Sequence, residues 1–258
     1  MDFSSFFKGF PVPYQESWIR SSTNLALTEV PRGEETDGET GAGTAGWAAV
    51  SAKGDLMPMV HAERRSLAGF LDTVPEEQWR APTWCDKWTV QDLVGHLTAA
   101  GNITAPHFFA GFIRRGFNFD RFVEGDLVRY AAGSPAEVRR RFDAIIDSDN
   151  KPPGPAYVAL GEVMVHGEDI RRPLGARGEH APEHLVALAE RYKSTGAPLR
   201  AKKRIEGLRL VATDVDWSTG AGPEVQGPCM SLILAMVGRR AALDDCEGPG
   251  VDTLASRP

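Results

Sequence analysis

The sequence predicts an α+β protein in which a four-helix bundle precedes a small α+β unit. Between residues 57 and 178, apolar residues recur at the three- and four-residue spacing of amphipathic helices. After Pro182 the pattern changes, because a helical segment is followed by Leu208–Thr213, which has the composition of a strand. We therefore expect two folded regions, 57–178 and 179–258, and a chain of 258 residues is long enough for both.

Residues 1–56 differ in composition from the rest of the chain. The segment Arg32–Thr44 is acidic and rich in Gly and Thr, so it cannot bury enough apolar surface to offset its ordering entropy. We expect a disordered extension. The alternative is that translation starts at Met57 or Met59 and that these residues are not part of the protein.

The composition is that of a soluble globular protein and excludes several classes of function. The net charge is −6, and no basic stripe interleaved with aromatic residues indicates nucleic-acid binding. No apolar run approaches the roughly 20 residues that a membrane helix needs. The three cysteines lie far apart, at Cys85, Cys229 and Cys246, which argues against a disulfide scaffold and suits a reducing cytoplasm. We expect a cytoplasmic protein that binds neither nucleic acid nor a membrane.

Proline and glycine mark the ends of three of the four predicted helices. The expected bounds are Met59–Pro75 for the first helix, Pro135–Asp147 for the third and Pro155–Arg172 for the fourth. Gly175 lies just beyond the fourth helix, where a chain commonly leaves a helix. Four helices with one long connection are typical of a bundle.

The second helix follows a loop rich in tryptophan, residues 79–88. Thr89 is a good N-cap residue, and Asp92 stands at the capping-box position three residues later. We expect the helix to continue, with a kink at Pro106, to about Arg115.

The C-terminal region alternates helix and strand signals. We expect a helix over His184–Lys193, a strand over Leu208–Thr213, and a strand end and turn over 214–222. A further helix is predicted from Gly227 to about Leu243.

Glu162 and His166 stand four residues apart in the fourth helix, so their side chains lie one above the other. Val158 lies one turn before Glu162, and a carboxylate among apolar side chains is costly unless its charge is compensated. A divalent metal would compensate it, and Glu with His is a common pair of zinc ligands. The alternative is an ordinary polar pair on a partly exposed helix.

His96 is the candidate for a third ligand, because its helix and that of Glu162 can face each other in a bundle. Two histidines and a glutamate with an open position are the pattern of catalytic zinc. Asp169 follows His166 by three residues and could accept the other imidazole N–H. Alternatively, Asp169 is an acid on the helix surface that pairs with Arg172 or another nearby base.

His180 and His184 repeat the four-residue spacing, but Pro182 marks a helix start between them. His180 then falls outside the first turn. We expect both histidines at the surface.

Two segments resemble motifs of a known family. Trp84–Leu97, which contains His96, resembles the segment leading to the first metal histidine of the mycothiol-dependent maleylpyruvate isomerase family, one of the wider DinB-like group of metal-binding helical bundles. Glu162–Gly175 is similar to the second motif, Glu-x₃-His followed by Asp and a Leu-Gly exit. Residues Leu208–Val251 are similar to the small sterol-carrier-like domain that is often attached. The likeness covers about residues 57–255.

The resemblance implies a zinc ion held by His96, Glu162 and His166, with mycothiol at the open position. Zinc lowers the pKa of a bound thiol and so provides a nucleophile at neutral pH. In the isomerase the thiolate adds to a conjugated double bond, the bond rotates, and elimination returns the trans product; relatives transfer the thiol to an electrophile. We expect one of these reactions on a small electrophilic, maleylpyruvate-like substrate. Nickel, iron or manganese would also fit these ligands.

The resemblance also implies an arginine from the C-terminal domain near the thiol site. Arg239 and Arg240 occupy the similar region, and either is a candidate catalytic residue that binds an anionic group. Their alternative is a basic last turn that complements a helix dipole. Trp88 and Asp169 are candidates for cofactor binding, and a core position is the alternative for Trp88. Cys85 is expected to pack rather than act as a nucleophile.

Two further hypotheses stay open. In one, the protein is a non-catalytic binding module whose C-terminal domain carries an apolar ligand. In the other, it is a regulatory protein that senses metal or thiol state. Thiol-dependent turnover distinguishes the enzyme from both.

Overall fold

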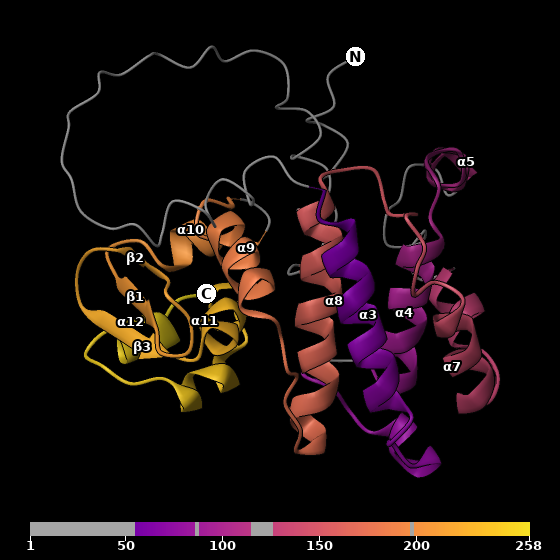
Figure 1. Cartoon of the computed structure of the whole chain (residues 1–258), viewed down its shortest axis with the longest axis horizontal. Coiled ribbons are helices and arrows are strands. Elements are labelled where there is room, and N and C mark those ends of the chain that lie inside the picture. The colour runs from indigo at the N-terminus through magenta and orange to yellow at the C-terminus, as the bar shows by residue number, and fades with distance from the viewer. Residues whose placement is uncertain (1–54, 86–87, 115–125, 197–198) are drawn as a thin grey trace.

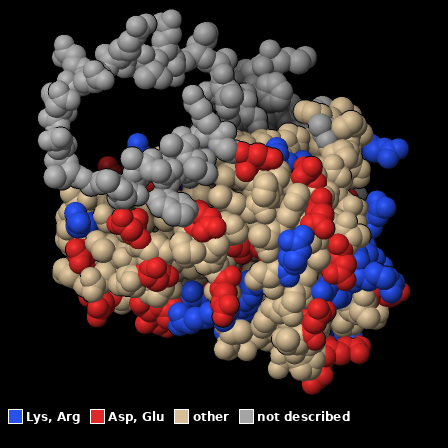
Figure 2. Space-filling view, in the orientation of Figure 1, with Lys and Arg blue, Asp and Glu red and all other residues tan. Residues whose placement is uncertain are grey.

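The structure is a computed structural model that describes residues 55–85, 88–114, 126–196 and 199–258. Residues 1–54, and with them nearly all of the predicted extension, lie outside the described residues. The described chain is mostly helical with one three-stranded sheet, which confirms the α+β class (Figure 1). Acidic and basic side chains are interspersed on the face shown in Figure 2. Among the described helices, none combines the length and the apolar character that crossing a membrane requires.

Four helices lie side by side and form the bundle (Figure 1). They are α3 (Met57–Leu71), α4 (Val90–Asn102), α7 (Pro135–Asp143) and α8 (Ala156–Arg171). Both α3 and α4 pack against α7 and against α8. A short 3₁₀ helix, η2 (Glu76–Arg80), lies against α4, and the separate helix α5 (Ala105–Arg114) follows α4 in the chain. The predicted four-helix bundle is therefore confirmed.

The predicted capping box fixes the start of α4. The Thr89 hydroxyl oxygen accepts a hydrogen bond from the Asp92 backbone N–H at 3.2 Å, and the Asp92 carboxylate accepts one from the Thr89 backbone N–H at 3.0 Å. Ser134 and Glu137 form the same box at the start of α7. Each box satisfies N–H groups that have no partner within the helix.

The predicted continuous helix through Pro106 is wrong. The chain leaves α4 at Ile103, which has extended backbone angles (φ −69°, ψ 118°). A new helix then begins, and the Thr104 hydroxyl accepts a hydrogen bond from the His107 N–H at 3.4 Å. Pro106 is the second residue of α5, where a helix needs no backbone donor, so the proline starts a helix instead of kinking one.

The C-terminal part is a small sheet covered by helices. Its elements are α9 (Pro182–Tyr192), α10 (Ala201–Arg204), β1 (Arg209–Ala212), β2 (Ser218–Gly220), β3 (Glu224–Gly227), α11 (Cys229–Met236), the 3₁₀ helix η4 (Arg240–Asp245) and α12 (Val251–Ala255). The strand order is β2-β1-β3, with β1 antiparallel to β2 and parallel to β3. The region predicted as strand end and turn thus contains the strand β2. The helix predicted to reach Leu243 ends at Met236, because Gly238 adopts a positive φ of 91°.

One apolar core runs through both parts of the molecule. Its fully buried side chains include Phe142 and Leu160 from the bundle and Leu188, Leu210 and Ile233 from the C-terminal part. The predicted division at residues 178 and 179 falls between the 3₁₀ helix η3 (Arg172–Leu174) and α9. Because the core is shared, this division into two domains stays a prediction.

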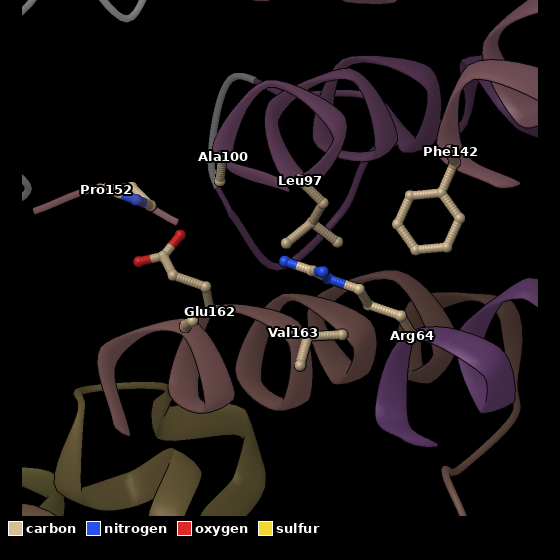
Figure 3. Close-up of a pocket in the computed structure, with 8 residues that line it drawn as sticks. Arg64, Leu97, Ala100, Phe142, Pro152, Glu162 and Val163 are labelled. Atoms are coloured by element: carbon tan, nitrogen blue, oxygen red, sulfur yellow. The ribbon is translucent and has the colours of Figure 1, made fainter. Parts of the chain in front are cut away.

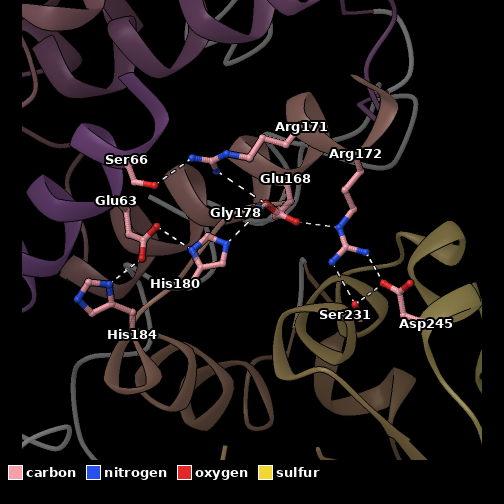
Figure 4. Close-up of polar contacts among 10 residues, drawn as sticks. All are labelled: Glu63, Ser66, Glu168, Arg171, Arg172, Gly178, His180, His184, Ser231 and Asp245. Atoms are coloured by element: carbon pink, nitrogen blue, oxygen red, sulfur yellow. Dashed lines mark hydrogen bonds and ion pairs between the residues drawn. The ribbon is translucent and has the colours of Figure 1, made fainter. Parts of the chain in front are cut away.

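A buried polar cluster also joins the two parts (Figure 4). Glu63 on α3 binds His180 Nδ1 through Oε2 at 2.8 Å and His184 Nδ1 through Oε1 at 2.6 Å. The side chains of Glu63 and His180 are only 4% and 1% exposed. The prediction that His180 and His184 lie at the surface is wrong. Glu63, which is more than 100 residues away in the sequence, pairs with both imidazoles inside the protein.

The cluster continues along α8 toward the sheet. Glu168 accepts hydrogen bonds from Arg172 Nε at 2.8 Å and from the Gly178 backbone N–H at 2.7 Å. Arg172 also reaches Asp245 Oδ2 at 2.6 Å and Ser231 Oγ at 3.0 Å (Figure 4). The end of α8 is therefore fixed to the C-terminal part by charge-assisted hydrogen bonds, which are stronger and more directional than neutral ones.

Replacement of Glu63 should change how stability depends on pH. Burial disfavours ionisation of Glu63, but the hydrogen bonds from His180 and His184 outweigh it and lower its pKa from 4.5 to about 2. Burial also disfavours the charged form of His180, but its contacts with Glu168 and Glu63 raise its pKa from 6.5 to about 9. The stability that ionised Glu63 contributes is therefore lost as pH falls from 4.5 toward 2. The stability that protonated His180 contributes is lost as pH rises from 6.5 through 9.

Glu63→Gln should lower the free energy of unfolding at pH 6 by about 3 kcal/mol, because it leaves buried imidazoles without their counterion. Urea unfolding at pH 6 and pH 9 would measure this. The wild type should lose more stability between these pH values than the variant does. Glu183→Gln, which removes an exposed acid from α9, is the matched control. An identical pH dependence in wild type and Glu63→Gln would contradict the pairing.

The close packing of α8 against α9 depends on Gly161. A Cβ at this position would overlap the hydroxyl oxygen of Tyr192, which is itself buried. Gly161→Ala should therefore lower the free energy of unfolding by about 1–3 kcal/mol through overpacking. Gly69→Ala on α3, where nothing lies within 4 Å, should instead raise it by up to about 1 kcal/mol. Thermal unfolding of both variants tests the contact, and equal shifts would contradict it.

Candidate metal centre

The structure brings His96, Glu162 and His166 together between α4 and α8. His96 Nε2 lies 2.9 Å from Glu162 Oε2, and His166 Nε2 lies 3.5 Å from the same oxygen. The two imidazole rings meet edge to face with their centroids 5.3 Å apart. One nitrogen or oxygen atom from each of the three side chains lies within 4.8 Å of the other two. The helices α4 and α8 therefore face each other, as expected for a bundle.

The orientation of His166 is set from its other side. Its Nδ1 lies 2.9 Å from Asp169 Oδ2, and an ionised carboxylate can only accept a hydrogen bond. A neutral His166 therefore carries its proton on Nδ1, which leaves the lone pair of Nε2 directed toward Glu162. This is the arrangement that a metal-binding imidazole needs.

Asp169 is in turn held by Arg239. The guanidinium donates from Nε to Oδ1 at 3.0 Å and from Nη2 to Oδ2 at 2.7 Å, so the pair is bidentate. Burial opposes ionisation of Asp169, but hydrogen bonds from His166 and Arg239 outweigh it and lower its pKa. Arg172, the surface partner considered as the alternative, pairs with Glu168 instead.

Of the two candidate arginines, Arg239 is the one that contacts this cluster. It follows α11 in the C-terminal part, so the site draws on both parts of the molecule. Arg240 is exposed, and its Nη2 donates to the Arg257 carbonyl at 3.3 Å. The turn after Gly238 directs the two neighbouring side chains to different surroundings.

The cluster is buried at one end and more accessible at the other. The side chains of His166 and Asp169 are 1% and 0% exposed, whereas those of His96 and Glu162 are 14% and 15% exposed. The Trp88 ring lies over His96 with centroids 4.8 Å apart and planes tilted by 45°. A molecule entering from solvent would meet His96, Glu162 and Trp88 first.

The donor set fits a divalent metal. Two ligands of a tetrahedral zinc with bonds of about 2.1 Å lie about 3.4 Å apart, and the nitrogen–oxygen separations of 2.9 and 3.5 Å fall on either side of this value. Burial opposes ionisation of Glu162, but a hydrogen bond from His96 and the nearby His166 lower its pKa. The carboxylate is thus ionised at neutral pH and supplies the negative charge that a cation requires.

Residues 60–151 match the model of the mycothiol maleylpyruvate isomerase N-terminal domain. Over these residues, which are about a third of the chain, the protein is similar to the N-terminal domain of that family. The match contains most of α3 and all of α4 and α7, and therefore His96. Glu162 and His166 lie on α8, beyond the last matched residue.

Two solved structures share the fold of this chain. One is a crystal structure of the mycothiol-dependent maleylpyruvate isomerase, with 13% sequence identity, a TM-score of 0.53, and coverage of 78% of this chain and 93% of that chain. The other is a histidine-to-alanine mutant of the same enzyme, with the same identity and coverage and a TM-score of 0.54. The comparison with curated proteins gives no match.

Cys85 lies closer to the site than sequence reasoning suggested. It shares a second cluster with His166 and Asp169, in which one sulfur, nitrogen or oxygen atom from each lies within 4.8 Å of the others. The loop that carries it is fixed by a hydrogen bond from the Trp84 N–H to the Asp169 carbonyl at 3.0 Å. The position of Cys85 in the first family motif, eleven residues before His96, was the available signal.

Proposed function

We propose that this protein is a member of the mycothiol maleylpyruvate isomerase family and a divalent-metal-dependent enzyme that uses mycothiol to isomerise a small conjugated electrophile. The observation that carries the proposal is the cluster of His96, Glu162 and His166, backed by Asp169 and lying partly open beside Trp88. The matching family and the enzyme whose crystal structures share this fold support the thiol and the reaction. A reducing cytoplasm would keep such a thiol available.

Three residues would hold the metal: His96, Glu162 and His166. A bound divalent metal lowers the pKa of a coordinated thiol and supplies a thiolate at neutral pH. Asp169 keeps His166 in the tautomer that presents Nε2, and Trp88 forms one wall beside His96. Near-complete burial of His166 and Asp169 excludes water from that end of the site and strengthens the electrostatic interactions there.

Arg239 acts as a positioning residue in this proposal. Its bidentate pairing with Asp169 fixes the carboxylate that orients His166, and most of its charge is already compensated. We therefore do not assign the binding of an anionic group to Arg239 or to Arg240. Among the contacts of the described residues, Arg240 makes none with this cluster and donates to the Arg257 carbonyl instead.

Metal content is the first test. The purified protein should contain about one zinc per chain by elemental mass spectrometry, and Glu162→Ala should lose it, because two imidazoles alone bind zinc much more weakly. Glu183→Ala, on the exposed side of α9, should keep the metal. No metal in the wild type after zinc is supplied would refute the site.

Turnover then separates the reactions. With mycothiol present, maleylpyruvate should convert to its trans isomer, and His96→Ala should abolish the conversion. A stable thiol adduct in place of the trans isomer would identify a thiol transferase. Metal binding without thiol-dependent turnover of conjugated electrophiles would favour the non-catalytic alternative.

The role of Asp169 gives a further prediction. Asp169→Asn should weaken zinc binding by about 10- to 100-fold, because an amide is a poorer acceptor for the His166 N–H. Competition with a chelator would measure the affinity. Asp245→Asn removes an acid that pairs with Arg172 and Arg177 and does not touch His166, so it should leave the affinity unchanged. Equal losses in both variants would point to general destabilisation.

A further inference from the structure

Two hollows of the described chain differ in what they can hold. The hollow in the bundle, which Arg64 and Glu162 line (Figure 3), has room for about one water molecule and admits no larger ligand. The second hollow, beside α10, has an empty volume of about 630 Å³, including the part open to solvent. Pockets of this size hold small molecules, so of these two only the second is a candidate ligand site.

Positive charge dominates the walls of the second hollow, which we call the C-terminal pocket. Its lining residues are Arg200, Lys203, Arg204, Glu206, Arg257 and Pro258. Among the described residues, every ion pair of the C-terminal part involves other cations, so no Asp or Glu side chain pairs with the four that line the pocket. Even with a terminal carboxylate at Pro258, cations outnumber acids by four to two. An anion in the pocket would therefore meet several uncompensated cations at once.

Arg204 forms a fixed wall of the C-terminal pocket. Its side chain is partly buried, and its Nη1 donates to the Leu199 carbonyl at 2.9 Å and to the Met236 carbonyl. Its Nε donates to the Pro258 carbonyl oxygen at 3.1 Å. These bonds hold the guanidinium in one place, so little conformational freedom is lost when a ligand binds to it.

Other arginines surround Arg204. Burial lowers the pKa of its guanidinium, and the nearby charges of Arg200, Arg239 and Arg240 lower it further. Like charges at short range repel one another, and an anion placed between them replaces repulsion by attraction. The pocket therefore favours a ligand that carries more than one negative charge.

The backbone of Arg200 gives a second indication. Its φ of 54° is the one positive φ of a non-glycine residue in the part of the chain that the structure describes. This left-handed conformation is costly for most residues, and Gly and Asn adopt it most readily. An arginine at such a position is exposed beside the pocket, which points to a use for its side chain there.

We propose that the C-terminal pocket binds the phosphate group of a small phosphorylated molecule through Arg200, Lys203 and Arg204. A phosphate monoester carries nearly two negative charges at neutral pH and three acceptor oxygens, whereas a carboxylate carries one charge. Guanidinium groups match its oxygens with parallel hydrogen bonds. None of the lining residues belongs to the candidate metal centre, so this site does not rest on the proposed function.

Phenyl phosphate and phenyl sulfate are matched probes for this pocket. They have nearly the same shape, but at about pH 7.5 the phosphate is largely a dianion and the sulfate a monoanion. Calorimetric titration of the full-length protein at constant ionic strength should show one phenyl phosphate per chain, bound about fivefold more tightly than phenyl sulfate. Equal affinities would overturn the proposal.

Single substitutions then assign the preference to the pocket. Arg200→Asn, which suits the left-handed backbone, and Lys203→Gln should each weaken phenyl phosphate binding about fivefold. Both side chains are exposed, so both variants should fold, whereas Arg204 also holds carbonyls of two other segments. Lys202→Gln removes an exposed charge from α10 that does not line the pocket and should leave the affinity unchanged. Equal losses in all three variants would mean general attraction to a basic surface and would overturn the site.

An acidic lining residue allows a test of opposite sign. Glu206→Gln removes the one acidic side chain of the pocket and should tighten phenyl phosphate binding about twofold or more. Glu183→Gln removes an exposed acid from α9 that does not line the pocket and should have no effect. No gain in Glu206→Gln would contradict binding in this pocket.

Glu162→Ala separates the pocket from the candidate metal centre. This variant, which should lose the proposed metal, should bind phenyl phosphate as the wild type does. Binding that disappears in Glu162→Ala but survives Arg200→Asn would mean that the phosphate coordinates the metal. That result would overturn the pocket and leave the proposed function standing.

Discussion

Burial of ionisable side chains along α8 is the constraint on which the rest of the structure depends. His166, Glu168 and Asp169 are all 1% exposed or less, and they lie within a single turn. An unpaired charge at this depth is strongly destabilising. The segment before α9 and the residues after α11 must therefore deliver partners to α8. Apolar burial is non-directional, so these pairings fix how the C-terminal part sits on the bundle.

Features set by neighbours in the chain could be predicted from the sequence. The four-residue spacing of Glu162 and His166 places both on one helix face. Thr89 and Asp92, three residues apart, form the capping box that fixes the start of α4. The ends of helices were less predictable, because they depend on single backbone choices. Ile103 adopts extended backbone angles three residues before Pro106, and Gly238 adopts a positive φ two residues after the end of α11. Neither conformation follows from apolar periodicity.

Buried charges could not be placed, because their partners are distant in the chain. Glu63 meets His180 across 117 residues, and general rules assign such residues to the surface. A signal was nevertheless present, since Glu63 and Arg64 stand between Val60 and Leu67 on the buried stripe of α3. Charged residues inside an apolar stripe indicate buried polar partners. Glu63 has two imidazole partners, and Arg64 donates to the Ile145 and Ser148 carbonyls.

Two arginines hold different parts of the molecule in place. Arg239 forms a bidentate pair with Asp169, so its charge organises Asp169 and through it His166. Arg64 is 5% exposed and donates to the Ile145 and Ser148 carbonyls, which holds the turn after α7 against α3. Arg239 thus supports the candidate metal centre from the C-terminal part, whereas Arg64 fixes two helices of the bundle to each other.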